Sequence, residues 1–299
     1  MIKINIEQCR RIALLIRNIE LLHDSYKTTK KLSKTEEANQ WFYLIAISHN
    51  IRSIGDKKKK GWDYLTHSIT NNNFLSSKWI KKIFEKDAPK DILRREYLIT
   101  DCKRFLQKNN VRSILDLYKQ TDYTLGGKMG IYIKLSSCEA YKDPIKNKTL
   151  LLTYILYKKK LVKIKDIENL LIPIEYNKIR VAIRNGIIRL PISLKLKILN
   201  KEIITRFEEL QLRQTVQNAL QKITQFSKRT PLDIDLLYWL IGRTCCKNKD
   251  CHLTEDYRDA LKQIASPLSR CPFSYKCKAF RNKKHINLDV PKTLSSEWF

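Results

Sequence analysis

Apolar residues recur at intervals of three and four along most of this 299-residue chain, and the alternation typical of β-strands is almost absent. That spacing collects apolar side chains on one face of a helix. Only 7 glycines and 8 prolines interrupt the pattern, so few positions favour a turn or break a helix. The sequence therefore predicts an all-α fold, and its length allows one or two compact helical units.

The first half of the chain carries four clear helical patterns. We expect a packing helix over residues 6–26 and a second helix over 39–50, whose apolar residues run nearly all the way round, which is typical of a helix buried on every side. Two amphipathic helices are expected within 76–108, with Cys102 as a buried thiol. A glycine cluster then predicts a turn before a helix over 131–138.

Two later helices have recognisable starting residues. Asp143 is suited to cap a helix, and Pro144 suits the first turn that follows. Thr230, Pro231 and Asp233 supply a cap, a first-turn proline and an acidic third position. The second pattern predicts a helix that ends near Gly242.

The chain has a formal net charge of +29, from 59 basic and 30 acidic residues. Such an excess indicates a polyanionic partner, with nucleic acid first and an acidic membrane surface second. No run approaches eighteen apolar residues, so we expect no membrane-spanning helix. The first residues lack the order of a signal peptide, and we expect a cytoplasmic, reducing location.

Five of the eight cysteines lie in one stretch near the C-terminus. A disulfide scaffold would instead be a short, secreted and cysteine-dense chain. Four thiolates are the usual ligands of an iron–sulfur cluster. Structural zinc is the alternative: the spacing of Cys246 and Cys251 fits a zinc knuckle, that of Cys271 and Cys277 fits less well, and His252 is a further candidate ligand.

The cysteine stretch resembles a known family. A helix that ends in Gly-Arg-x-x-Cys, followed by a Cys-Pro-x4-Cys closure, is similar to the iron–sulfur loop of endonuclease III-like members of the helix-hairpin-helix DNA glycosylases. The residues that carry this resemblance are Gly242, Arg243, Cys246, Cys251, Cys271 and Cys277. The resemblance implies that the four cysteines hold a [4Fe–4S] cluster, with zinc as the alternative, and that basic residues such as Arg243 contact DNA.

The loop departs from the family pattern between its second and third cysteines, where nineteen residues, 252–270, replace a short gap. Because closing a loop costs only about 0.6 kcal/mol more per doubling of length, the insertion costs on the order of 2 kcal/mol and does not forbid the site. Its apolar residues are spaced as in a helix. The Gly-Arg-x-x-Cys count selects Cys246 as the ligand and leaves Cys245 as a buried thiol.

A second segment, residues 171–186, resembles the helix start at which these glycosylases carry an aspartate followed five residues later by an arginine. Glu175 and Arg180 hold those two places. The resemblance implies that the Glu175 carboxylate stabilises the cation-like sugar formed when an N-glycosidic bond breaks. At a helix start the dipole favours the charged carboxylate. The sequence departs from the family in having Glu for Asp, and in showing no Gly-x-Gly hairpin.

Further contacts with the substrate are implied for lysines and aromatic residues. Bifunctional glycosylases add a lysine that forms a Schiff base with the sugar. Lys148 and Lys146 precede Glu175 by a number of residues that resembles the lysine-to-acid separation in archaeal 8-oxoguanine glycosylases. A lysine run contains Lys58 and Lys59, which are candidates for binding phosphate. The candidates for stacking on an extruded base are Trp62 and Tyr176, while Arg180 is a further candidate for binding the substrate.

The resemblance implies a two-lobed helical glycosylase fold with a C-terminal [4Fe–4S] loop. We expect an N-terminal helix packed on the second lobe, a first lobe, a second lobe with the active-site helix, the cluster loop and a tail, over residues 1–29, 30–140, 141–244, 245–280 and 281–299. The expected function is that of a monomeric DNA N-glycosylase, with or without AP-lyase activity, acting on a damaged or modified base flipped from duplex DNA. Two alternatives stay open: a non-catalytic iron–sulfur protein that binds nucleic acid, and an N-glycosidase for a modified, 7-deazaguanine-type nucleotide.

Overall fold

The computed structural model describes most of the chain, namely residues 1–21, 32–49, 51, 54–55, 61–68, 76–84, 91–247 and 270–293. Over these ranges the chain is helical, and the four strands have two residues each. The prediction of an all-α fold is therefore confirmed. None of the described helices is long and apolar enough to cross a membrane.

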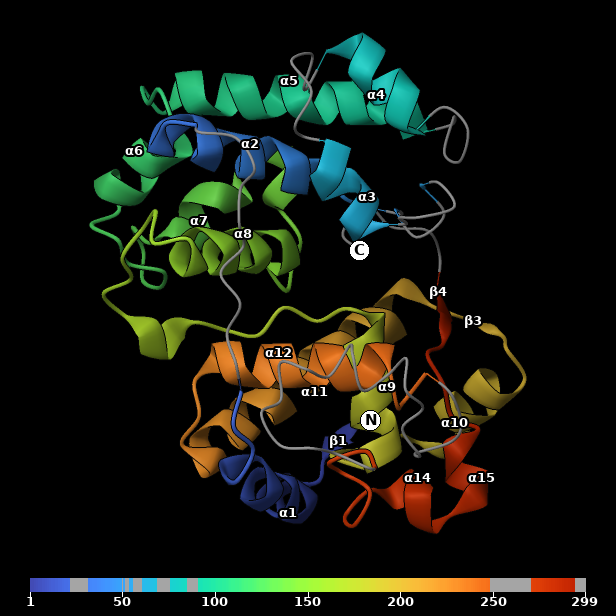
Figure 1. Ribbon diagram of the computed structural model, residues 1–299. Coiled ribbons are helices and arrows are strands. Elements are labelled where there is room, and N and C mark those ends of the chain that lie inside the picture. Colours follow the sequence, from blue (N-terminus) through green and yellow to red (C-terminus); the bar gives the residue numbers. More distant parts are fainter. Residues whose placement is uncertain are drawn as a thin grey trace. The chain divides into compact units, whose positions relative to one another are not determined.

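The contacts divide the chain into two units, whose helices are labelled in Figure 1. Unit 1 contains residues 1–24 and 171–294, and unit 2 contains residues 25–170 and 295–299. Unit 1 is thus built from two segments that are distant in the sequence. The expected boundary at residue 140 differs from the observed one, because residues 141–170 pack within unit 2.

Unit 1 is built around four helices. Helix α1 (Ile6–Arg17) packs along α11 (Arg206–Ser227), and α9 (Tyr176–Asn185) packs against both α11 and α12 (Pro231–Arg243). The smaller elements are β1 (Lys3–Ile4), β2 (Ile188–Arg189), α10 (Ile192–Leu199), β3 (Ile203–Ile204), α14 (Lys278–Arg281), α15 (Lys283–Ile286) and β4 (Lys292–Thr293). Strand β1 pairs with β2 antiparallel, and β3 pairs with β4 parallel.

The sequence predicted the start of α12 correctly but not the end of α1. Helix α12 begins as predicted: the Thr230 side chain accepts the Asp233 N–H, the Asp233 carboxylate accepts the Thr230 N–H, and Pro231 occupies the first turn. Helix α1, by contrast, ends at Arg17 rather than near residue 26. The N–H of Asn18 bonds back to the last carbonyls of the helix and closes it.

Unit 2 is organised around α2 (Lys34–Ala46), which packs against α5 (Ile92–Lys108), α6 (Ile114–Gln120) and α8 (Asn147–Lys158). Helix α2 is the buried helix expected over residues 39–50, but it begins earlier because Ser33 and Glu36 form a capping box. The other helical elements are α3 (Trp62–His67), α4 (Ser77–Phe84), α7 (Ile131–Ser136), η3 (Glu139–Tyr141) and η4 (Ile167–Asn169).

Helix α8 starts later than its sequence pattern predicts. Its first residue is Asn147, so Pro144 lies before the helix rather than in its first turn. Asp143 still serves the helix start, since its carboxylate accepts the N–H groups of Asn147 and Lys148. The capping role of Asp143 is therefore correct, although the helix begins three residues beyond Pro144.

Candidate functional site

Glu175 lies at the N-cap of α9, in unit 1. Its carboxylate accepts hydrogen bonds from the backbone N–H groups of Asn177, at 2.8 Å, and Lys178, at 3.2 Å. These are two of the donors that the first turn of a helix leaves without an intrahelical partner. The side chain nevertheless keeps 26% of its surface exposed. The structure therefore holds a carboxylate at a fixed place that solvent and small groups can reach.

Arg180, one turn further along α9, joins three parts of unit 1. Its guanidinium donates to Asn177 Oδ1 and to the backbone oxygen of Gly242, both at 3.1 Å, and to Asp289 Oδ1 at 2.7 Å. Burial alone would raise the pKa of Asp289, but the hydrogen bond from Arg180 and neighbouring positive charge hold it below its usual value. The contacts that the structure gives Arg180 thus lie inside the unit.

Gly242 explains how closely α9 and α12 approach each other. A Cβ atom added at Gly242 would lie 2.6 Å from the backbone oxygen of Asn177 and 2.7 Å from its Cβ. Both obstacles belong to the first turn of α9, beside Glu175. The glycine in the Gly-Arg-x-x-Cys pattern is therefore required by the crossing of two helices.

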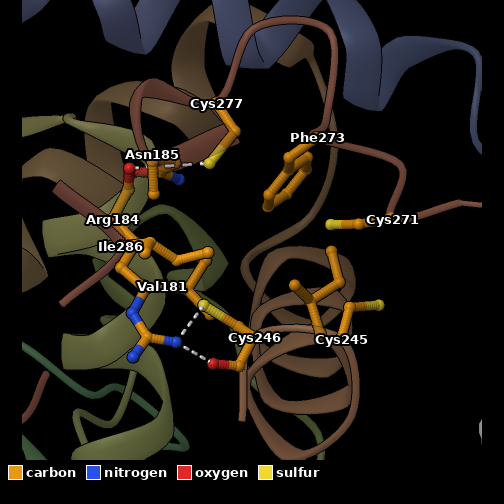
Figure 2. A pocket seen from close by; sticks show the side chains of 11 residues that line it. Val181, Arg184, Asn185, Cys245, Cys246, Cys271, Phe273, Cys277 and Ile286 are labelled. Atoms are coloured by element: carbon orange, nitrogen blue, oxygen red, sulfur yellow. Dashed lines mark hydrogen bonds between the residues drawn. The ribbon is translucent and has the colours of Figure 1, made fainter. Parts of the chain in front are cut away.

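Four cysteines line one pocket beyond the end of α12, shown in Figure 2. Cys245 and Cys246 directly follow α12, while Cys271 and Cys277 flank the turn that leads into α14. The pocket is completed by residues of α9 and by apolar neighbours, namely Val181, Arg184, Asn185, Ile241, Phe273, Ala279 and Ile286. Segments that are distant in sequence thus bring their cysteines to one place.

Arg184 connects α9 to both cysteine segments. Its buried guanidinium donates to the backbone oxygen of Cys246 and lies 3.8 Å from Cys246 Sγ, and its own backbone oxygen accepts from the Cys277 thiol at 3.5 Å. Figure 2 shows these contacts as dashed lines. Arg184 also forms an ion pair with Asp289 at 3.2 Å.

The thiols in the pocket differ in their environments. Burial raises the pKa of Cys246 to about 12, and it also raises the pKa of Cys277. Hydrogen bonding between Cys245 and Cys271 lowers the pKa of Cys245 and raises that of Cys271. In Figure 2 the sulfur of Cys245 points away from the sulfurs of Cys246 and Cys277.

Three of the four predicted cluster ligands, Cys246, Cys271 and Cys277, line this pocket. The fourth, Cys251, lies outside the described residues. Within the described ranges, no three side chains of His, Cys, Asp or Glu lie close enough together to hold a single metal ion.

The candidate lysines belong to unit 2, whereas Glu175 belongs to unit 1. Lys148 is buried, and its Nζ donates to the backbone oxygen of Ala46 at 2.7 Å. Lys146 is half-buried at the left-handed residue before α8, with its Nζ 5.8 Å from the centre of the Tyr132 ring. Lys58 and Lys59 lie outside the described residues.

Lys148 and Arg95 both donate hydrogen bonds to backbone oxygens at the C-terminal end of α2 in unit 2. Arg95, fully buried, donates to the backbone oxygens of Ile47 and His49, next to the Ala46 oxygen that Lys148 contacts. The last carbonyls of a helix lack intrahelical partners, and cations stabilise them. Burial, followed by the positive charges of Arg95 and Lys148, lowers the pKa of His49 to about 2, so this histidine is neutral.

The aromatic candidates are half-exposed, and each contacts a neighbour. The Trp62 ring stacks on Trp41, with ring centres 6.2 Å apart. The Arg180 guanidinium lies 5.8 Å from the centre of the Tyr176 ring. Arg243 is exposed on the last turn of α12, and its guanidinium lies 4.9 Å from the Trp239 ring centre.

Several residues of the site were not singled out by the sequence analysis. Arg184 had a usable signal, since it lies four residues after Arg180 and so on the same face of α9. Asn177 and Asp289 had none, because their roles depend on contacts with Arg180 that only the fold creates.

Comparisons with known proteins find similarity among solved structures. No protein-family model matches the chain, and no curated protein matches it. Among solved structures, the chain is similar to the 8-oxoguanine DNA glycosylase from Pyrobaculum aerophilum in complex with 8-oxoguanosine. The sequences are 15% identical, the match covers 89% of this chain and 91% of that chain, and the TM-score is 0.47. A similarity of this size leaves the function to be argued from the residues themselves.

Proposed function

We propose that this protein is a DNA N-glycosylase that removes a damaged or modified base, with Glu175 as the carboxylate at the sugar. One observation carries the proposal. The segments that resemble the glycosylase pattern, 171–186, 242–246 and 271–277, come together in unit 1 and are joined by Arg180 and Arg184. Separate matches in sequence thus form one continuous structure.

The chemistry requires a carboxylate like that of Glu175. When an N-glycosidic bond breaks, the base leaves with the bonding electron pair and positive charge develops on the sugar. A carboxylate that is already fixed in place stabilises this charge without reorganising, and it can also orient the attacking water. Glu175 is held by two backbone N–H groups and remains partly exposed.

We propose Lys148 or Lys146 as the amine of a lyase step. In this step the neutral amine of Lys148 or Lys146 attacks the anomeric carbon as the base departs, and loss of an amine proton with opening of the sugar ring gives the Schiff base. Lys148 would have to release the Ala46 carbonyl to react. Lys146 is the more exposed of the two.

We also propose that Cys246, Cys251, Cys271 and Cys277 hold a [4Fe–4S] cluster, with zinc as the alternative. The residues of the described pocket suit a cluster, since its lining has thiols and apolar groups but no carboxylate, and the cation of Arg184 lies beside Cys246. When bound, the cluster would supply a rigid cross-link between the end of α12 and the segment before α14.

The function is tested with a panel of duplex oligonucleotides that each carry one lesion. Base release is measured with the wild type and with Glu175→Gln, and borohydride is added to trap a Schiff base. We expect release from at least one substrate, with a large loss in the variant. Binding without release from any substrate would favour the non-catalytic alternative, and release only from a free modified nucleotide would favour the nucleotide N-glycosidase.

A further inference from the structure

Lys178 is a buried lysine in the first turn of α9, with 3% of its side chain exposed. Its ammonium lies between two carboxylates, 2.9 Å from Asp235 Oδ1 on α12 and 3.9 Å from Glu175 Oε1. Its backbone N–H donates to the same Glu175 oxygen at 3.2 Å. One residue therefore contacts Oε1 of Glu175 through both its backbone and its side chain.

A buried ammonium is costly unless negative groups surround it. Asp235 supplies the short contact and fixes the position of the Lys178 side chain. Glu175 supplies the longer contact, and it is the more exposed of the two carboxylates, at 26% against 19%. The ion pair with Asp235 therefore fixes the Lys178 ammonium beside α12. In that position the ammonium also lies close to the Glu175 carboxylate.

We propose that Lys178 is a positioning residue that holds the Glu175 carboxylate in place for catalysis, with Asp235 as its anchor. The inference rests on the proposed function of Glu175. A glutamate has one more rotatable bond than the aspartate of the resembled family, so two contacts to backbone N–H groups restrain it less completely. The Lys178 side chain adds a third contact and stabilises the negative charge that the developing sugar cation requires.

The competing explanation is that Lys178 only links α9 to α12. A double-mutant cycle separates the two roles, because a positioning residue acts only while the group that it positions is present. Lys178→Met is therefore made in the wild type and in Glu175→Gln. Single-turnover base release and substrate affinity are measured for all four proteins.

We expect Lys178→Met to lower the single-turnover rate by about tenfold to a hundredfold in the wild type, as a misplacement near 1 Å does, with little change in affinity. In the Glu175→Gln background the same substitution should change the rate by less than about twofold. Lys178→Arg, which keeps the charge, should recover part of the rate. Lys222→Met removes an exposed lysine of α11 and is the matched control, with the wild-type rate expected.

Removing one buried charge can unfold a protein, so a second variant is needed. Lys178→Met combined with Asp235→Leu removes both charges and leaves no unpaired buried ion, a change that folded proteins often tolerate. It should fold and show the same loss of rate. An equal loss from Lys178→Met in both backgrounds would show a structural link only. A wild-type rate in Glu175→Gln alone would instead overturn the proposed function itself.

Discussion

At the scale of the residue, Glu175 has two tasks, since its carboxylate caps α9 and is the group proposed to face the sugar. Replacing it with Gln removes the charge at nearly constant shape. We expect turnover to fall by roughly two to four orders of magnitude, while DNA affinity stays level or rises slightly because repulsion of the phosphates is relieved. Single-turnover base release and equilibrium binding measure the two effects. Unchanged release would leave Glu175 as a helix cap only.

Glu175→Asp tests whether the site is built for the longer side chain. Aspartate is also a good N-cap residue, so α9 should keep its start. Its oxygens, however, would lie about 1 Å away from the position near the Lys178 ammonium, and a displacement of that size can cost about a hundredfold in rate. We expect Asp to be nearly as slow as Gln in base release. A rate equal to the wild type would mean that the pocket does not depend on the length of Glu.

The residues of the site differ in how far the sequence revealed them. Glu175 was placed at a helix start through the resemblance of residues 171–186 to the glycosylase segment, and it is the N-cap of α9. The contacts of Lys178 with Asp235 and of Arg184 with Asp289 cross more than fifty residues. No local pattern indicates such long-range pairs, so Asp235 and Asp289 were not identified from the sequence as partners of these cations. Lys178 itself is three residues from Glu175, a spacing that places both on one face of the helix start.

At the scale of the element, the crossing of α9 and α12 depends on the missing side chain at Gly242. Alanine favours a helix interior over glycine by about 1 kcal/mol, so without the contact Gly242→Ala would stabilise α12. Because the new Cβ meets the Asn177 backbone, we expect a net destabilisation of about 1–3 kcal/mol, as in other overpacked sites. Urea unfolding measures it.

A matched control for Gly242→Ala is Gly127→Ala in unit 2. Among the described residues, no atom lies within 4 Å of a Cβ placed at Gly127, but its φ of +76° strains an alanine. Gly127→Ala should therefore destabilise the fold through backbone strain and not through a packing clash. The substitution should leave base release unchanged. Gly242→Ala should lower both stability and base release, and full activity in this variant would argue against a tight crossing at Glu175.

The two neighbouring cysteines after α12 give a prediction about the metal site. Four thiolates satisfy a [4Fe–4S] cluster, so protein purified without oxygen should be brown and contain iron and sulfide. Cys246→Ala should lose the colour, whereas Cys245→Ala should keep it. The Gly-Arg-x-x-Cys spacing selects Cys246, and the sulfur of Cys245, which is hydrogen-bonded to Cys271, points away from those of Cys246 and Cys277 (Figure 2). Colourless protein with stoichiometric zinc would reject the cluster, and the reverse result for the two variants would reject the ligand assignment.

The start of a helix was predictable where a side chain caps it, as at Thr230. The sequence did not show which helices pack against one another. Residues 141–170 were expected in the second lobe, yet α8 packs on α2 in unit 2. Helix α8 is apolar on most of its surface, with buried residues throughout. A helix of that kind predicts burial but carries no sign of which neighbour buries it.

At the scale of the whole molecule, the net charge of +29 predicts how DNA binding responds to salt. Each phosphate neutralised on duplex DNA contributes a slope of about −0.9 to the dependence of log affinity on log salt concentration. We expect a steep loss of affinity between low and moderate salt, measured by fluorescence anisotropy with an undamaged duplex. An affinity that does not change with salt concentration, or an absence of binding, would exclude DNA as the substrate.

The division of the chain also bears on how it folds during synthesis. Unit 2 is nearly continuous in sequence, whereas unit 1 joins residues 1–24 to residues 171–294. Domains generally fold as units while the chain emerges, so unit 2 can form early. Helix α1 meanwhile must wait for α11, with its buried residues Ile12 and Ile16 still uncovered. Unit 1, which carries Glu175, is therefore completed last. In a chain truncated before α11, helix α1 would lack the helix that covers its apolar face.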